Sequence, residues 1–332
     1  MSTFNPLWPR AILLASALAA GAGHASTIDP NTPASAFSGV VSINIQYAGQ
    51  SFICSGALVG ARSVATAGSC VDASGNGTPV DLSQPGSTVT VIFNSDGDSN
   101  AQIAASSISV HPDFQGFGVC PAAATSTTTC FNDNLAVLTL ASDAPASAKI
   151  YSIAANPVTA GTPIIVAGYG NAGNGVSAEG APSFTVKRSG ANQADVFEGD
   201  DEQNFSGPNE VFYADFDGAG HDTFCSDFGV CTGQLPAGVE STIATGDIGG
   251  PAFIMVGGEL ALAGINTFFS TDVNQVGTFG TYFGGTLLAS YADYLRGATN
   301  GTATFVPEPG SIMLMGLGAV LLGAARRRLR KA

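Results

Sequence analysis

The chain has 332 residues and a net charge of −14 at neutral pH, with 25 acidic residues against 11 basic ones. The segment 26–305 keeps only five of the basic residues but 24 of the acidic ones, so its net charge is −19. Such a surface repels the phosphates of nucleic acids and of anionic lipid headgroups, which excludes both as expected partners.

The N-terminal segment has the composition of a signal peptide. Arg10 precedes the apolar run AILLASALAAGAG, and Gly23 and Ala25 are small residues at the two positions that a signal peptidase reads. The run is shorter than the about 20 residues that a spanning helix needs, which favours removal over a permanent anchor. We therefore expect residues 1–25 to be cleaved off during export.

Short apolar runs, broken by turn residues, fill the central part of the chain. They begin with VVSINI and end with LALAGINTFF, and each has the length of a strand. The one good helical pattern is late, in TLLASYADYLRG. Its apolar face would consist of Leu287, Leu288, Tyr291, Tyr294 and Leu295. The pattern predicts an all-β fold that ends in one helix, and about 270 residues leave room for two barrels.

Six cysteines in an exported chain indicate disulfides rather than free thiols. Fifteen pairings are possible. Spacing in the sequence favours the pairs Cys54–Cys70, Cys120–Cys130 and Cys225–Cys231.

Several polar stretches are expected to be surface loops. These are residues 118–131, which the second disulfide would close, and residues 196–210. Two acidic stretches have a spacing compatible with calcium, but neither ends in the bidentate glutamate of a calcium loop, so we expect solvated turns. Their residues are Asp96, Asp98 and Asn100, and Asp215, Asp217 and Asp222. The sequence predicts no metal site and no cofactor.

Three segments occur in an informative order: CSGALVGARSVATAGSCV at 54–71, FNDNLAVLTL at 131–140 and TGDIGGPAF at 245–253. They resemble the segments of chymotrypsin-like serine proteases that carry the catalytic histidine, aspartate and serine. SVHPDF, GTPIIVAGYGN and ALAGINTFFS resemble further landmarks, so the likeness spans about residues 38–297. The resemblance implies two six-stranded antiparallel β-barrels with a cleft between them, at about 36–145 and 150–297 of a domain at 26–299.

The resemblance places Ser69 at the histidine position, Asn134 at the aspartate position and Ile248 at the serine position. Catalysis in the family needs a hydroxyl nucleophile, a histidine to take its proton and a carboxylate to orient that histidine. Ile248 has no nucleophilic atom, Ser69 is no base near neutral pH, and Asn134 carries no charge. We therefore expect no catalytic residue and a pseudoprotease. The alternatives are an active serine endopeptidase, as the family implies, and a purely structural matrix component.

Neighbouring residues are not expected to replace the triad. Asp133 is one residue from the aspartate position, and a shift of one residue along a strand turns a side chain to the other face. We expect His111 and His221 to be surface histidines, because a general base must reach its proton within hydrogen-bond distance.

The frame of the nucleophile loop persists. The residues that resemble it are Gly246, Asp247, Gly249, Gly250 and Pro251. In the family, the backbone N–H groups at the positions of Gly246 and Ile248 form the oxyanion hole. Asp247 matches an aspartate that pairs with a newly exposed N-terminus, but no segment like I-V-G-G precedes SGVVSINI, so activation by cleavage is not indicated. Thr242 matches a position near the base of the specificity pocket.

The C-terminal segment begins with Val306, Pro307, Glu308 and Pro309, and continues with the apolar stretch Ile312–Ala325 and a basic cluster. It resembles the PEP-CTERM sorting signal of Gram-negative bacteria, which implies an exosortase partner and a destination in the cell envelope or outside it. The arginines would hold the end of one transmembrane stretch on the cytoplasmic side. The alternative is an ordinary single-span membrane anchor. It would have the same topology, but it would not explain the Pro-Glu-Pro motif. The expected partners are thus a peptide or protein ligand, an exosortase and the membrane.

Overall fold

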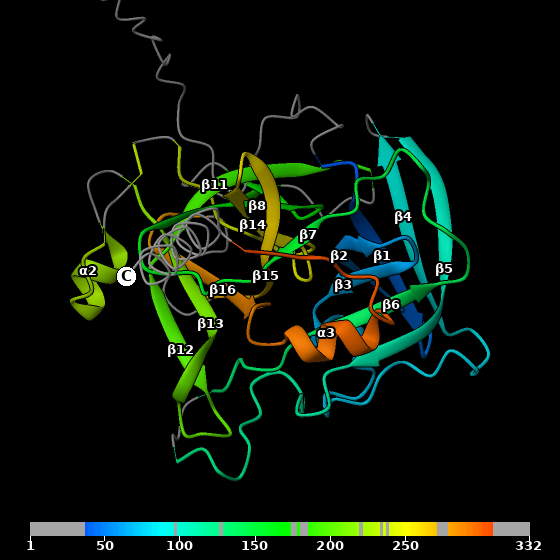
Figure 1. Ribbon diagram of the computed structural model, residues 1–332, viewed down its shortest axis with the longest axis horizontal. Coiled ribbons are helices and arrows are strands. Elements are labelled where there is room, and N and C mark those ends of the chain that lie inside the picture. The colour runs from blue at the N-terminus through cyan, green and yellow to red at the C-terminus, as the bar shows by residue number, and fades with distance from the viewer. Residues whose placement is uncertain are drawn as a thin grey trace, which may run out of the picture.

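The computed structural model describes residues 37–95, 98–125, 129–173, 178–179, 185–218, 222–232, 235–236, 239–270 and 278–307. Six strands form a closed barrel in the order β1-β2-β3-β6-β5-β4 (Figure 1). They are β1 (Val40–Tyr47), β2 (Gln50–Gly60), β3 (Ser63–Thr66), β4 (Thr88–Ser95), β5 (Asp98–Val110) and β6 (Ala136–Leu140).

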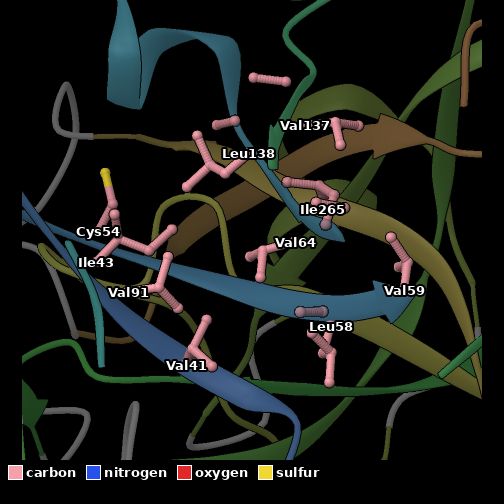
Figure 2. Packing of buried hydrophobic residues seen from close by; sticks show 14 of the residues in the cluster. Val41, Ile43, Cys54, Leu58, Val59, Val64, Val91, Val137, Leu138 and Ile265 are labelled. Carbon is pink, nitrogen blue, oxygen red and sulfur yellow. The ribbon is translucent and has the colours of Figure 1, made fainter. Parts of the chain in front are cut away.

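The apolar residues of these strands fill the barrel. Val41, Ile43 and Ile45 alternate along β1 and are fully buried, as the period of two in a strand requires. Ile265, from a strand of the second half of the chain, belongs to the same buried cluster as Val41 and Ile43 (Figure 2). One core therefore joins the two halves of the chain.

The second half forms a curled sheet of nine strands. Seven of them follow the order β11-β8-β14-β15-β16-β13-β12, and β7 pairs with β15 and β17. They are β7 (Ser152–Ala154), β8 (Thr162–Gly168), β11 (Arg188–Ala194), β12 (Val196–Asp200), β13 (Ser206–Phe216), β14 (Pro251–Val256), β15 (Glu259–Phe269), β16 (Thr281–Leu287) and β17 (Phe305–Val306). A separate two-stranded sheet pairs β9 (Ala172–Gly173) with β10 (Ala178–Glu179).

In the second sheet, β11 and β13 form no strand ladder with each other, and single hydrogen bonds connect them. Asn192 on β11 donates through Nδ2 to the carbonyl oxygen of Asp215 on β13 at 2.7 Å, and the N–H of Asp195 donates to the carbonyl of Tyr213 at 2.9 Å. The all-β, chymotrypsin-like expectation is confirmed: the first barrel has its six strands, and the second is a half-barrel with a seam between β11 and β13.

Three short helices complete the described fold: α1 (Gly68–Val71), α2 (Thr223–Phe228) and α3 (Ala292–Ala298). The expected C-terminal helix is present but begins later than its apolar pattern indicated. Leu287 ends strand β16, where it pairs with Gly264, because strand pairing with β15 outweighs the helical spacing.

The prediction of a surface loop at 196–210 is wrong, because these residues belong to the hairpin of β12 and β13. The hairpin turns through Asn204 and Phe205, whose φ angles are 56° and 59°. Thr125 contacts this turn, since its hydroxyl donates to Asn204 Oδ1 at 2.6 Å.

All three predicted disulfides are confirmed. The structure joins Cys54 to Cys70, Cys120 to Cys130 and Cys225 to Cys231. The first ties β2 to α1, and the other two close local loops.

Carboxyl groups are buried beside the seam of the second sheet. Asp215 is 3% exposed, so its predicted place in a solvated turn is wrong. Its Oδ2 accepts from the N–H of Phe224 at 2.8 Å. Burial, and then the charges of Asp217, Asp195 and Glu240, raise the pKa of Asp215 to about 8. Burial likewise raises the pKa of Glu240 to about 7.

The raised pKa values of Asp215 and Glu240 predict that the folded protein is more stable at acidic pH. Their pKa values in the folded protein, about 8 and 7, lie above the value of about 4 for an unfolded chain. Folding therefore takes up protons, and the stabilisation is lost as pH rises through about 7 to 8. We expect the unfolding temperature to fall by several degrees between pH about 5 and about 8.

Thermal unfolding followed by circular dichroism across this pH range checks the prediction. Asp215→Asn removes a titrating group and should flatten the slope. The control Asp143→Asn removes an equal charge from a side chain that is 77% exposed, and should leave the slope unchanged. An unfolding temperature that rises with pH would contradict the assignment.

Candidate functional site

A cavity of about 240 Å³ lies where the first barrel meets the loop before β14. Its walls come from both halves of the chain: β2, α1, the loop that ends at β14, and the end of β15. The lining residues are Tyr47, Phe52, Ile53, Cys54, Ser69, Cys70, Asp72, Thr245, Gly246, Ile248 and Phe269. This is the position at which the resemblance places the catalytic cleft.

The structure brings the residues at the histidine and aspartate positions together. The Asn134 side chain accepts at Oδ1 from the N–H of Ser69 at 2.8 Å and donates through Nδ2 to Ser69 Oγ at 3.2 Å. Asn134 is 1% exposed. The neutral amide of Asn134 makes both contacts, so no charge is buried at this solvent-inaccessible position.

The third position, Ile248, lines the same cavity as Ser69. It belongs to a loop that is held between the two halves. Gly249 N–H donates to the carbonyl of Asn266 on β15, and Ser55 N–H on β2 donates to the carbonyl of Ile248, both at 2.8 Å. The hydroxyl of Ser55 donates to the carbonyl of Gly246 at 2.7 Å. These bonds hold the loop around Ile248 in place between the two halves.

The backbone N–H groups at the oxyanion positions are open. Gly246 and Gly249 take φ angles of 98° and 83°, a region that favours glycine. Within the described part of the chain, the N–H groups of Gly246 and Ile248 donate to no protein atom. Two such donors bind a carbonyl oxygen or a carboxylate.

Asp247 is buried behind this loop. Its Oδ1 accepts from the N–H of Gly170 at 2.6 Å, and its Oδ2 accepts from the N–H of Ala244 at 3.0 Å. Burial raises the pKa of Asp247 to about 6, against the effects of these bonds and of Arg188. Among the described residues, backbone N–H groups thus occupy the place that an N-terminus takes in activated family members. A Cβ at Gly170 would lie 2.2 Å from Oδ2, so only glycine fits there.

The cavity contains no evident general base. Tyr47 and Asp72 are the titratable groups among its described lining residues, since Cys54 and Cys70 form a disulfide. Asp72 accepts backbone N–H groups of the turn that follows it, among them Gly75 at 2.9 Å and Gly77 at 3.0 Å. Its carboxylate is therefore committed to that turn.

His111 is not the surface histidine that the sequence predicted. Its side chain is 13% exposed, and its Nδ1 lies 3.1 Å from Asp133 Oδ1. The rings of Tyr291 and Tyr294 contact it edge to face, each with a centroid distance of 4.9 Å. Asp133 takes a left-handed φ of 59°. Neither His111 nor Asp133 lines the cavity, so this pair does not replace the missing base.

Other predicted positions are less informative. Thr242 is buried, 3% exposed, and does not line the cavity. His221 and Asp96 lie outside the described residues, as do Glu308, Pro309 and the apolar stretch Ile312–Ala325. Across the part of the chain that the structure describes, no helix has the length and apolar character needed to cross a membrane.

Comparison with known families agrees with this geometry. The family model for trypsin matches residues 28–289. A PEP-CTERM protein-sorting motif matches residues 305–331, which indicates recognition by an exosortase and export to the envelope of a Gram-negative bacterium. No curated protein matches the chain.

Proposed function

The chain belongs to the trypsin family, and we propose that it is an exported pseudoprotease that binds a peptide or protein segment without cleaving it. The observation that supports this most strongly is the proximity of the side chains at the three triad-equivalent positions, none of which is a histidine or a carboxylate. Ser69 and Asn134 are hydrogen-bonded to each other, and Ile248 lines the cavity beside Ser69. Proton transfer from a nucleophile needs groups that these three side chains lack.

The cavity favours an apolar peptide side chain. Phe52, Ile53, Ile248 and Phe269 give it an apolar wall, and burying a side chain there removes apolar surface from water. The open N–H groups of Gly246 and Ile248 would bind a carbonyl oxygen of the same peptide. The apolar wall and the two N–H groups together would bind a peptide without cleaving it.

Two other functions compete with this proposal. An active endopeptidase would need a general base to activate a hydroxyl nucleophile. Ser69 and Thr245 bring hydroxyl groups to the cavity, but no general base is evident among the described lining residues. A purely structural envelope component would need no cleft. The loop around Ile248 instead retains positive-φ glycines and two open N–H donors, and these features favour binding.

Peptide binding tests the proposal. We would measure fluorescence anisotropy with labelled short peptides that differ only in a central Phe, Leu, Lys or Asp. The purified chain should bind the Phe and Leu peptides best, and mass spectrometry should recover them intact. Ile248→Glu should weaken binding by about tenfold or more, because it places a charge in the apolar wall.

The matched control is Met255→Glu, which changes a β14 side chain that is 56% exposed and does not line the cavity. It should bind peptide like the wild type. Cleaved peptides would favour the endopeptidase. No binding by any peptide to the folded chain would favour the structural component.

A further inference from the structure

Four acidic residues gather on the β12–β13 hairpin, away from the lining of the cleft. Asp200, Asp201, Glu202 and Glu210 each bring one carboxylate oxygen within 4.8 Å of the others. Ca²⁺ binds oxygen ligands at about 2.3–2.6 Å, so two ligands on opposite sides of one ion lie at most about 5 Å apart. Four carboxylate oxygens can therefore reach one Ca²⁺ ion. Mg²⁺ usually keeps several waters and is held by only one or two carboxylates, so a set of four protein carboxylates favours calcium.

One of these carboxylates has a buried oxygen atom without a partner. Asp201 is 2% exposed, and its buried Oδ1 has no hydrogen-bond partner among the described residues. An unsatisfied, buried carboxylate oxygen is costly unless a cation or a donor meets it. This oxygen is an independent sign that the hairpin binds something positive.

A neighbouring side-chain amide also has a buried oxygen atom without a hydrogen-bond partner. Asn132 is 5% exposed, and its Nδ2 donates to Glu210 Oε2 at 2.9 Å and to the carbonyl of Gly199 at 2.8 Å. Its own Oδ1 is buried and lacks a partner within the described part of the chain. Amide oxygens are, like carboxylates, ligands that calcium accepts.

Among the described residues, no basic side chain pairs with the cluster. The five basic residues of segment 26–305 bind elsewhere: Arg62 to Asp143, Lys149 to Glu259, Arg296 to Asp293, Lys187 to the carbonyl of Phe37 and Arg188 to the carbonyl of Gly170. His111 pairs with Asp133. In the described part of the chain, the four carboxylates of the hairpin therefore have no basic side chain paired with them.

We propose that Asp200, Asp201, Glu202 and Glu210 bind one Ca²⁺ ion, with the Asp201 Oδ1 atom as the central ligand. The ion supplies the positive charge that the hairpin lacks. Asn132 contacts Glu210 and lies two residues before Asn134. By holding Glu210, the ion would also stabilise the segment 132–134, which brings Asn134 to Ser69.

Calorimetric titration of the purified full chain with CaCl₂, after removal of metal by a chelator, tests the site. We expect one equivalent of Ca²⁺ to bind and Mg²⁺ to bind more weakly. Asp201→Asn keeps the shape of the side chain but removes its charge, and should weaken Ca²⁺ binding by about tenfold or more. Glu210→Gln should have a similar effect, and provides a second variant if Asp201→Asn fails to fold.

The matched control is Asp113→Asn, which removes a charge that acts on Glu202 but is not one of the four ligands. It should bind Ca²⁺ like the wild type. Tyr291 interacts with Glu210, so Tb³⁺ bound at the hairpin should also show luminescence on tyrosine excitation. The proposal is overturned if the wild type releases no heat with millimolar Ca²⁺, or if Asp201→Asn and Glu210→Gln both bind as it does.

Discussion

The triple variant Ser69→His, Asn134→Asp, Ile248→Ser is expected to hydrolyse activated esters and to react with fluorophosphonates, whereas Ile248→Ser alone stays almost inert. A serine without a base keeps its proton, and the members of a triad act as one unit. The carboxylate contributes about 10⁴ in rate in the template case because it fixes the imidazole tautomer. Asn134→Asp should therefore matter only once Ser69→His is present.

The geometry of the site supports this expectation. Asn134 already contacts Ser69, so the new aspartate and histidine would be neighbours. The N–H groups at 246 and 248 need no change, since they come from the backbone.

Rates of ester hydrolysis for the wild type, each single variant and the triple variant check the prediction. The matched control is Ser69→His, Asn134→Asp, Ile248→Ala, which restores the base and its partner without a nucleophile. A folded triple variant no faster than this control would show that the cleft itself, and not only its three residues, is unsuited to catalysis.

Gly249→Ala is expected to lower the free energy of unfolding by about 3 kcal/mol or more. Gly249 has a φ of 83°, and an added Cβ would lie 2.2 Å from Thr66 Oγ1 and 2.4 Å from the carbonyl oxygen of Ser55. The backbone contact cannot relax by a rotamer change, so the loop or β2 must move.

Gly161→Ala provides the control for backbone conformation. Gly161 has a nearly equal φ of 82°, but an added Cβ would meet nothing within 4 Å. Its cost should be limited to about 1–2 kcal/mol. Urea denaturation of both variants separates the steric effect from the backbone effect. Equal losses would mean that the loop yields easily, and that the glycine frame is not a constraint on this site.

The features that could be read from the sequence are mostly local. Alternating apolar residues such as Val41, Ile43 and Ile45 predicted strands, and short spacings predicted the disulfides. The glycines around Ile248 predicted the tight loop, because a glycine pattern of this kind reflects backbone constraints, and Gly246 and Gly249 take positive φ angles.

The features that escaped prediction depend on tertiary contacts. The burial of His111 needs Tyr291 and Tyr294, about 180 residues further along the chain. Asp215 looked like a turn residue beside Asp217, yet pairing of β13 with β16 places it in a sheet. Residues 196–210 are polar enough for a loop, and only their pairing across the hairpin shows that they bring Asp201 and Glu210 together.

The most direct test of the pseudoprotease proposal is fluorophosphonate labelling of the purified wild-type chain beside an active trypsin-like protease. We predict that the control is labelled and that this chain is not, because the resemblance places Ile248 at the nucleophile position and the one carboxylate among the described lining residues, that of Asp72, accepts the N–H groups of a turn. Labelling of the wild type that disappears when a single serine, such as Ser69, is changed to alanine would contradict the proposal and establish an active enzyme.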